Sequence, residues 1–595
     1  MSKSAQTSVP RGPFTLEAAL QGLATDGLLH PEQARILAGE IGAAGTRHPL
    51  VAIAERAPED ARRAGHALTL EELTQWLAQH CELPYLRIDP LHLDVARITA
   101  IVPYPYAARA RILPVKVSAS ELVVAVADPY DRGWEADLAR MVPQQIRRVV
   151  ANPLDIERYL VEFYALARSV KSAERERARS SRGGPHNLEQ LTELGRSNTL
   201  SADDQHVVAI VDWLMQYAFE QRASDIHFEP RRDVAHVRFR IDGVLHEVYQ
   251  MPAGVYAAVS SRIKILARMD VAEKRRPQDG RIKTRSPDGK EIEMRVSSLP
   301  TVFGETLVLR IFDPEVLVKD YAALGFSRAD SERWKQLVGN SNGIILVTGP
   351  TGSGKTTTLY STLKQLATPE VNVCTIEDPI ELVEPAFNQM QVHHGIDLSF
   401  AAGVRALMRQ DPDIIMVGEI RDLETAEVAI QAALTGHLVL STLHTNDAPS
   451  AITRLLDLGV PAYLIKGTLL GVVAQRLVRT LCPHCKQPHP MDPALWKELT
   501  GGWSVAPPRQ VFAAVGCLEC RETGFLGRCG IYEIMAATAP VKALVHADTD
   551  IARLRETAIR DGMLPLRLCG AQKVADGLTT PAEVLRVAPP PLIRS

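Results

Sequence analysis

A glycine-rich segment near the middle of the chain has the residue types and spacing that bind phosphate. Residues 349–356 read Gly-Pro-Thr-Gly-Ser-Gly-Lys-Thr, which fits the pattern of Gly, four residues, Gly, Lys and Ser or Thr. The apolar residues 344–347 before it predict a short buried strand, and leucines at helical spacing behind it predict a helix. Glycines let backbone N–H groups converge on phosphate oxygens at the start of such a helix. We therefore interpret residues 349–356 as a phosphate loop, the alternative being a glycine-rich turn.

The phosphate-loop pattern predicts roles for two of its side chains. Lys355 would neutralise the β- and γ-phosphates of ATP, and Thr356 would offer its hydroxyl to Mg2+. The nucleotide-binding residues predicted here are Gly349, Pro350, Thr351, Gly352, Ser353, Gly354, Lys355, Thr356 and Thr357.

Acidic side chains follow two further strand-like segments. Three carboxylates lie within five residues, from Glu377 to Glu381, after the strand-like residues 371–374. A second apolar run, residues 414–417, leads to Glu419, with Gly418 between the run and the acid. Acids at strand ends suit water activation and magnesium coordination, although a single surface carboxylate after a strand is common. We predict catalytic roles for Glu381 and Glu419 and add Glu377 as a candidate.

Two histidines flank a third buried strand. His437 precedes and His444 follows the apolar residues 438–443. Lone histidines are usually structural, so only the neighbouring motifs make these two candidates for a functional role.

The order of these four segments resembles the type II secretion and type IV pilus assembly ATPase family, from about residue 205 to 570. The family names them Walker A, Asp box, Walker B and His box. The resemblance implies that Lys355 and Thr356 bind phosphate and magnesium, that Glu381 orients the attacking water and that Glu419 holds Mg2+. It also implies that His437 and His444 sense the γ-phosphate.

The resemblance further implies an architecture. It predicts an α/β fold with a PAS-like α+β lobe, then a RecA-like ATPase core, assembled as a homo-hexamer. ATP would then lie between lobes and subunits, with arginines completing the charge stabilisation. Arg295 and Arg310 match the positions expected to reach the phosphates, and Arg240 and Arg281 are further candidates, each with a plain surface arginine as the alternative.

Four of the eight cysteines form two Cys-x-x-Cys pairs separated by 31 residues. Two such pairs offer four thiolates to one tetrahedral ion, whereas a redox pair would not explain the second. We predict a structural zinc site made by Cys482, Cys485, Cys517 and Cys520. The resemblance agrees, because secretion and pilus-extension members carry this element and the pilus-retraction branch lacks it.

Composition excludes several classes of protein. The 595 residues contain 67 Lys plus Arg and 70 Asp plus Glu, a net charge of −3, which argues against a general nucleic-acid binder. The first 14 residues lack the apolar core of a secretory signal, and no stretch reaches the roughly 18 apolar residues that span a bilayer. We therefore predict a cytoplasmic protein that is only peripherally attached to the inner membrane, through a partner.

The chain divides into segments of different character. Alternating strand and helix patterns, separated by a charged, Gly- and Pro-terminated stretch, predict several domains. We predict a helical extension (1–65), a docking domain (66–167), a flexible linker (168–204) with a helical start, the PAS-like lobe (205–318) and the RecA-like domain (319–595), which includes the zinc element (480–530) and a helical C-terminal tail. We expect helices over residues 16–23 and 31–41, and strands over residues 111–117 and 121–126.

Residues 78–165 resemble the N-terminal domain of secretion ATPases, especially at Glu82-Leu-Pro-Tyr85. This resemblance implies docking onto inner-membrane platform proteins. Residues 1–65 show no clean cyclic dinucleotide motif, so that ligand is not predicted. The predicted function is ATP hydrolysis that powers type II protein secretion. Type IV pilus assembly is the alternative, and a DNA-uptake or conjugation-type motor ranks last.

Overall fold

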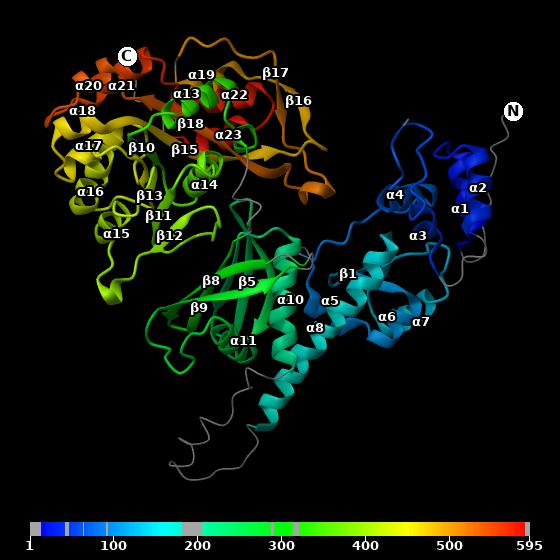
Figure 1. Cartoon of the computed structure of the whole chain (residues 1–595). Helices are drawn as coiled ribbons and strands as arrows, with labels where there is room; N and C mark the ends of the chain where they lie inside the picture. The colour runs from blue at the N-terminus through cyan, green and yellow to red at the C-terminus, as the bar shows by residue number, and fades with distance from the viewer. Residues whose placement is uncertain are drawn as a thin grey trace, which may run out of the picture. The chain divides into compact units, whose positions relative to one another are not determined.

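A computed structural model describes most of the chain (Figure 1). The described residues are 14–41, 47–63, 65–90, 93–180, 205–286, 289, 291–312, 320–501 and 503–588. The chain divides into two compact units, residues 1–311 and residues 312–595.

Helices open the first unit. Thr69 caps the fourth of them with a capping box, in which its hydroxyl accepts from the N–H of Glu72 while the Glu72 carboxylate accepts from the N–H of Thr69. Leu23, Leu50 and Leu77 are buried in the shared core. The helices predicted over residues 16–23 and 31–41 are confirmed. The elements are α1 (Leu16–Thr25), α2 (Pro31–Ile41), α3 (Pro49–Ala54) and α4 (Leu70–His80).

A three-stranded sheet with four helices follows. The sheet has the order β1-β2-β3, with β1 antiparallel and β3 parallel to the nearly fully buried β2. The strands predicted at residues 111–117 and 121–126 are confirmed. The elements are β1 (Ile112–Val117), β2 (Glu121–Val126), β3 (Gln145–Val150), α5 (Val95–Ile101), α6 (Tyr104–Ala110), α7 (Glu135–Met141) and α8 (Pro153–Ser180).

Helix α8 extends into the segment predicted as a linker. It continues to Ser180, so the first part of the predicted linker is helical, and residues 181–204 lie outside the described residues. Arg158 of α8 forms ion pairs with Glu162, at 2.7 Å, and with Glu220 of the next helix, α10 (Gln205–Glu220). α8 and α10 therefore pack together within the first unit.

An antiparallel six-stranded sheet completes the first unit, in the order β6-β5-β4-β9-β8-β7. Side chains along β5 alternate between buried and half-buried, because successive residues of a strand point to opposite faces. The ring of Tyr217 on α10 lies 5.7 Å from that of Phe239 on β5. This arrangement confirms the predicted α+β lobe. The elements are β4 (Asp225–Pro230), β5 (Val234–Ile241), β6 (Val244–Pro252), α11 (Ala253–Leu266), β7 (Gln278–Arg285), β8 (Glu291–Thr301) and β9 (Gly304–Phe312).

The second unit is built on a seven-stranded sheet in the order β12-β11-β13-β14-β10-β15-β18. Its strands are parallel except for β18, which runs antiparallel to β15. The central strands are buried on both faces, which explains their apolar runs. The strands are β10 (Gly343–Thr348), β11 (Val373–Glu377), β12 (Asn388–Gln391), β13 (Ile414–Val417), β14 (Leu438–Leu443), β15 (Leu469–Leu481) and β18 (Phe525–Ala536).

Helices cover this sheet, and a small two-stranded sheet of β16 and β17 lies between β15 and β18 in sequence. The remaining elements are α12 (Tyr321–Leu324), α13 (Arg328–Val338), α14 (Lys355–Leu366), η3 (His394–Ile396), α15 (Phe400–Leu407), α16 (Leu423–Leu434), α17 (Pro449–Asp457), α18 (Ala462–Thr468), β16 (Gln487–Pro490), α19 (Pro493–Thr500), β17 (Gln510–Ala513), η4 (Leu518–Cys520), α20 (Ala539–Ala543), α21 (Ile551–Arg560), α22 (Leu566–Ala575) and α23 (Pro581–Val587). Across the described parts of both units, no helix combines the length and the apolar character needed to cross a bilayer.

Candidate functional site

The phosphate loop lies between a strand and a helix, as the sequence predicted. β10 ends at Thr348 and α14 begins at Lys355. Gly352 and Gly354 have φ angles of +78° and +85°, which residues with a side chain adopt only at a cost. Thr356 and Thr357 are half-buried in the first turn of α14. The loop therefore has the shape that presents backbone N–H groups to an anion at a helix N-terminus.

Two side chains of the loop fit a phosphate group. Ser353 is 4% exposed, and its hydroxyl oxygen is buried without a hydrogen-bond partner among the described residues. The ammonium group of Lys355 donates to the carbonyl oxygens of Gly349, at 2.8 Å, and Pro350, at 3.1 Å. Burial lowers the pKa of Lys355 to about 8, while Glu419 opposes this shift and Arg476 adds to it. A buried hydroxyl in need of a partner and a partly desolvated cation are groups that a phosphate satisfies.

Glu377 is enclosed by hydrogen bonds. Its Oε2 accepts from the Tyr360 hydroxyl at 2.7 Å and from the N–H of Glu381 at 3.4 Å. Its Oε1 accepts from the hydroxyl of Thr375 at 2.7 Å and from the amide of Gln389 at 3.3 Å. Because both oxygens are engaged in a buried setting, this geometry favours a role in holding the Glu381 backbone over the direct catalytic role that we predicted.

Glu381 and Glu419 follow neighbouring parallel strands, β11 and β13. The carboxyl ends of parallel strands meet at one edge of a sheet, where ligands of α/β proteins bind. The Glu419 carboxylate lies 3.3 Å from Nε2 of His444, which follows β14, and also pairs with Arg421. The predicted carboxylates and His444 are therefore placed at the same edge as the phosphate loop.

His437 is placed differently. β14 occupies all the residues between the two histidines, and at about 3.3 Å per residue it separates them by roughly 23 Å. The carbonyl oxygen of His437 accepts from the N–H of Gly343, at the start of β10, whereas the phosphate loop follows the end of β10. A direct γ-phosphate role for His437 thus conflicts with the geometry, because the strand holds it at the opposite edge of the sheet.

The predicted arginines all lie on the sheet of the first unit. Arg240 and Arg310 stand opposite Asp225, and Nε of Arg310 donates to its Oδ1 at 2.9 Å. Arg281 stands opposite Arg295 on β7 and β8. In each strand the buried side chains alternate with these arginines, so all four share the less buried face. Their action on ATP stays a prediction.

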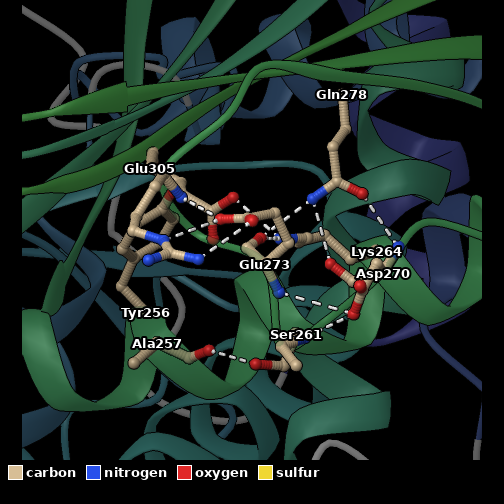
Figure 2. A network of polar contacts seen from close by, with 10 residues as sticks. Tyr256, Ala257, Ser261, Lys264, Asp270, Glu273, Gln278 and Glu305 are labelled. Atoms are coloured by element: carbon tan, nitrogen blue, oxygen red, sulfur yellow. Dashed lines mark hydrogen bonds and ion pairs between the residues drawn. The ribbon is translucent and has the colours of Figure 1, made fainter.

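A buried ion pair orders the segment that leads to Arg281 (Figure 2). The ammonium group of Lys264, which is 1% exposed, donates to Oε1 of Glu305 at 2.8 Å and to the carbonyl oxygen of Glu273 at 2.7 Å. The amide of Gln278 donates to the same Glu273 carbonyl at 2.9 Å. The chain from residue 270 to β7 is thereby tied to α11 and β9.

Replacing Lys264 by Met is expected to loosen this segment. The change leaves the buried Glu305 carboxylate without its cation, which costs about 3 kcal/mol. Hydrogen–deuterium exchange should accelerate at residues 270–278, and Arg285→Ala, which breaks the exposed pair with Glu291, should have almost no effect. Equal exchange in both variants would contradict a structural role for the buried pair.

The four cysteines of the predicted metal site lie together in the fold. Their sulfur atoms lie within 4.8 Å of one another, and the Cys482–Cys517 and Cys485–Cys520 distances are 3.7 Å. A tetrahedral ion with Zn–S bonds of about 2.3 Å places its sulfurs about 3.8 Å apart. The donor set therefore fits a closed four-thiolate site, and its two halves come from pairs that 31 residues separate in sequence.

Sequence reasoning missed several side chains that support the site. Tyr360 and Gln389 hold Glu377, and Gln475 and Arg476 lie beneath the phosphate loop. The last two interrupt an otherwise apolar run, residues 469–478, and this interruption is the one sequence signal that could have identified them.

Comparison with known proteins agrees with this geometry. The profile of the family described as Type II/IV secretion system protein matches residues 200–586, and that of the MshEN domain matches residues 81–170. The chain is 54% identical to the Type IV pilus assembly ATPase TfpB of Acinetobacter baylyi, over 91% of this chain and 92% of that protein. It is 45% identical to the Type II secretion system protein E of Aeromonas hydrophila, over 66% and 78%.

Among solved structures, the ATPase DotB of Legionella pneumophila aligns with 65% of this chain and 95% of its own, at 20% identity and a TM-score of 0.49. The profile match covers more than half of the chain, and the curated relatives include ATPases for pilus assembly. The chain therefore belongs to the Type II/IV secretion system protein family, and it is a secretion or pilus assembly ATPase.

Proposed function

We propose that the chain hydrolyses ATP in a Mg2+-dependent reaction and works as a homo-hexameric motor. The observation that carries the proposal is the phosphate loop between β10 and α14, at the same edge of the sheet as Glu419 and His444. Thr356 and Glu419 would hold Mg2+, which would offset the charge of the phosphates, and Glu381 orients the attacking water. His444, beside Glu419, responds to the γ-phosphate.

We also propose that Arg295 and Arg310 act on ATP bound by a neighbouring subunit. The support is their common position on the open face of a sheet, where guanidinium groups can meet an anion. Arginines supplied to a phosphate loop from outside stabilise the charge of the transition state.

Mixing inactive variants tests this sharing of the site. Lys355→Ala and Arg310→Ala are each expected to abolish most turnover, whereas mixed oligomers should recover part of it, because some sites combine an intact loop with an intact arginine. Arg310→Ala mixed with the double variant Lys355→Ala/Arg310→Ala is the matched control and should recover nothing. ATPase assays measure turnover, and sedimentation of the same samples measures the oligomeric state. A fully active monomer would contradict the shared site.

For the machine, we propose type IV pilus assembly, with type II secretion as the second candidate. The sequence favoured type II secretion. Both kinds of relative match, but the pilus assembly ATPase is similar over nearly the whole chain and at higher identity. Deletion of the gene should abolish pili, with Lys355→Ala failing to restore them. Loss of exported enzymes with intact pili would favour type II secretion.

The partners follow from the same proposal. Residues 66–167 contact platform proteins at the cytoplasmic face of the inner membrane, and the near-neutral charge favours no direct contact with nucleic acid. A chain that lacks residues 1–167 should leave the membrane fraction. Continued co-sedimentation of that truncated chain would exclude this docking role.

A further inference from the structure

Two buried polar residues of β15 form the floor of the phosphate loop. Gln475 is 1% exposed and Arg476 is 6% exposed. A Cβ built on Gly349 would lie 2.6 Å from the carbonyl oxygen of Gln475 and 3.1 Å from Nη1 of Arg476. A Cβ on Gly354 would lie 2.9 Å from Nε2 of Gln475. Both ends of the loop therefore rest directly on β15.

The guanidinium group of Arg476 also contacts the segment after β14. Its Nη2 donates to the carbonyl oxygen of Asn446 at 2.8 Å and to its side-chain oxygen at 3.3 Å, while Nη1 donates to the carbonyl oxygen of Gln475 at 2.9 Å. Asn446 follows His444 by two residues, and His444 contacts Glu419. One side chain thus joins the floor of the phosphate loop to the strand end that faces the predicted magnesium ligand.

The charge of Arg476 is not matched by a local carboxylate. Among the described residues, no carboxylate lies within ion-pair distance of its guanidinium group. The two acids whose charges act on Arg476, Asp447 and Glu533, have other partners: Asp447 pairs with Arg555 at 2.9 Å, and Glu533 accepts from the N–H groups of Ala448 and Leu566. A buried positive charge without a carboxylate partner is unfavourable, so the negative charge of a phosphate in the loop would compensate it.

We propose that Arg476 is a positioning residue for the nucleotide phosphates, which fixes the phosphate loop against the end of β14 and supplies a second positive charge behind Lys355. This inference rests on the proposed ATPase function. Arg476 acts through the loop and through Asn446, without touching the nucleotide.

The experiment measures the Kd of a fluorescent ADP analogue and the kcat for ATP, with the full-length protein. Arg476→Met is expected to weaken nucleotide binding about tenfold and to lower kcat. Arg476→Lys keeps the charge but not the two-pronged contact with Asn446, so its Kd should stay near the wild-type value while its kcat falls. Arg479→Met is the matched control, because Arg479 is on the same strand but pairs with Glu583, at 2.6 Å.

The outcomes distinguish failure of the proposed ATPase function from failure of the role inferred for Arg476. If wild-type protein binds no nucleotide, the proposed function fails and this inference fails with it. If wild-type protein binds normally and Arg476→Met leaves both Kd and kcat unchanged, the inference alone is overturned. If circular dichroism shows that Arg476→Met does not fold, the test depends on Arg476→Lys alone. A wild-type kcat in Arg476→Lys would then overturn the inference.

Discussion

Replacing Glu381 by Gln is expected to lower ATP turnover by about two orders of magnitude or more while ATP still binds. An amide keeps the size of the side chain but cannot accept a proton from water or orient it in the same way. Binding should persist because the phosphate loop and Lys355, which we propose hold the phosphates, lie between β10 and α14, whereas Glu381 follows β11. A single-turnover assay beside a nucleotide-binding titration measures both quantities.

The control for this variant is Glu370→Gln, an exposed acid before β11 that should leave both quantities unchanged. The position of Glu381 depends on Glu377, which is held by Tyr360, Thr375 and Gln389. Wild-type turnover in Glu381→Gln would remove Glu381 from its role and would leave the phosphate-loop assignment standing.

Loss of the tetracysteine metal site is expected to unfold part of the second unit. Thiolate–zinc bonds supply folding free energy directly, so Cys485→Ser should lose the metal and destabilise the segment around it. The damage should spread to the C-terminal helices, because the ammonium group of Lys486 donates to the carbonyl oxygen of Gly577 at 2.8 Å and Leu481 donates to Leu578 at 2.8 Å. Elemental analysis and hydrogen exchange at residues 482–530 and 566–587 test this.

Cys529→Ser is the matched control, since Cys529 lies on the adjacent β18 outside the cluster. That variant should keep about one zinc per chain. Protein never exposed to a chelator that holds far less than one zinc would exclude the structural metal and favour the redox interpretation of the two pairs.

The sequence was most informative where function is carried by adjacent residues. The phosphate loop is one contiguous segment between a strand and a helix, and the apolar runs for β10, β13 and β14 predicted its sheet because burial on both faces demands apolar side chains. The two Cys-x-x-Cys pairs were equally local. Periodicity likewise located several helices and strands of the first unit, whereas the charged end of α8 has no apolar pattern to mark where the helix stops.

The tertiary structure decided what depends on contacts between distant residues. It placed His444, but not His437, at the edge of the sheet that holds the phosphate loop, because the two histidines lie at opposite ends of β14. It enclosed Glu377 with Tyr360 and Gln389, which makes it a support for Glu381, and it placed Arg476 beneath the loop, more than 100 residues further along the chain. Local propensities determine which residues form a strand, whereas the pairing of strands determines which side chains meet.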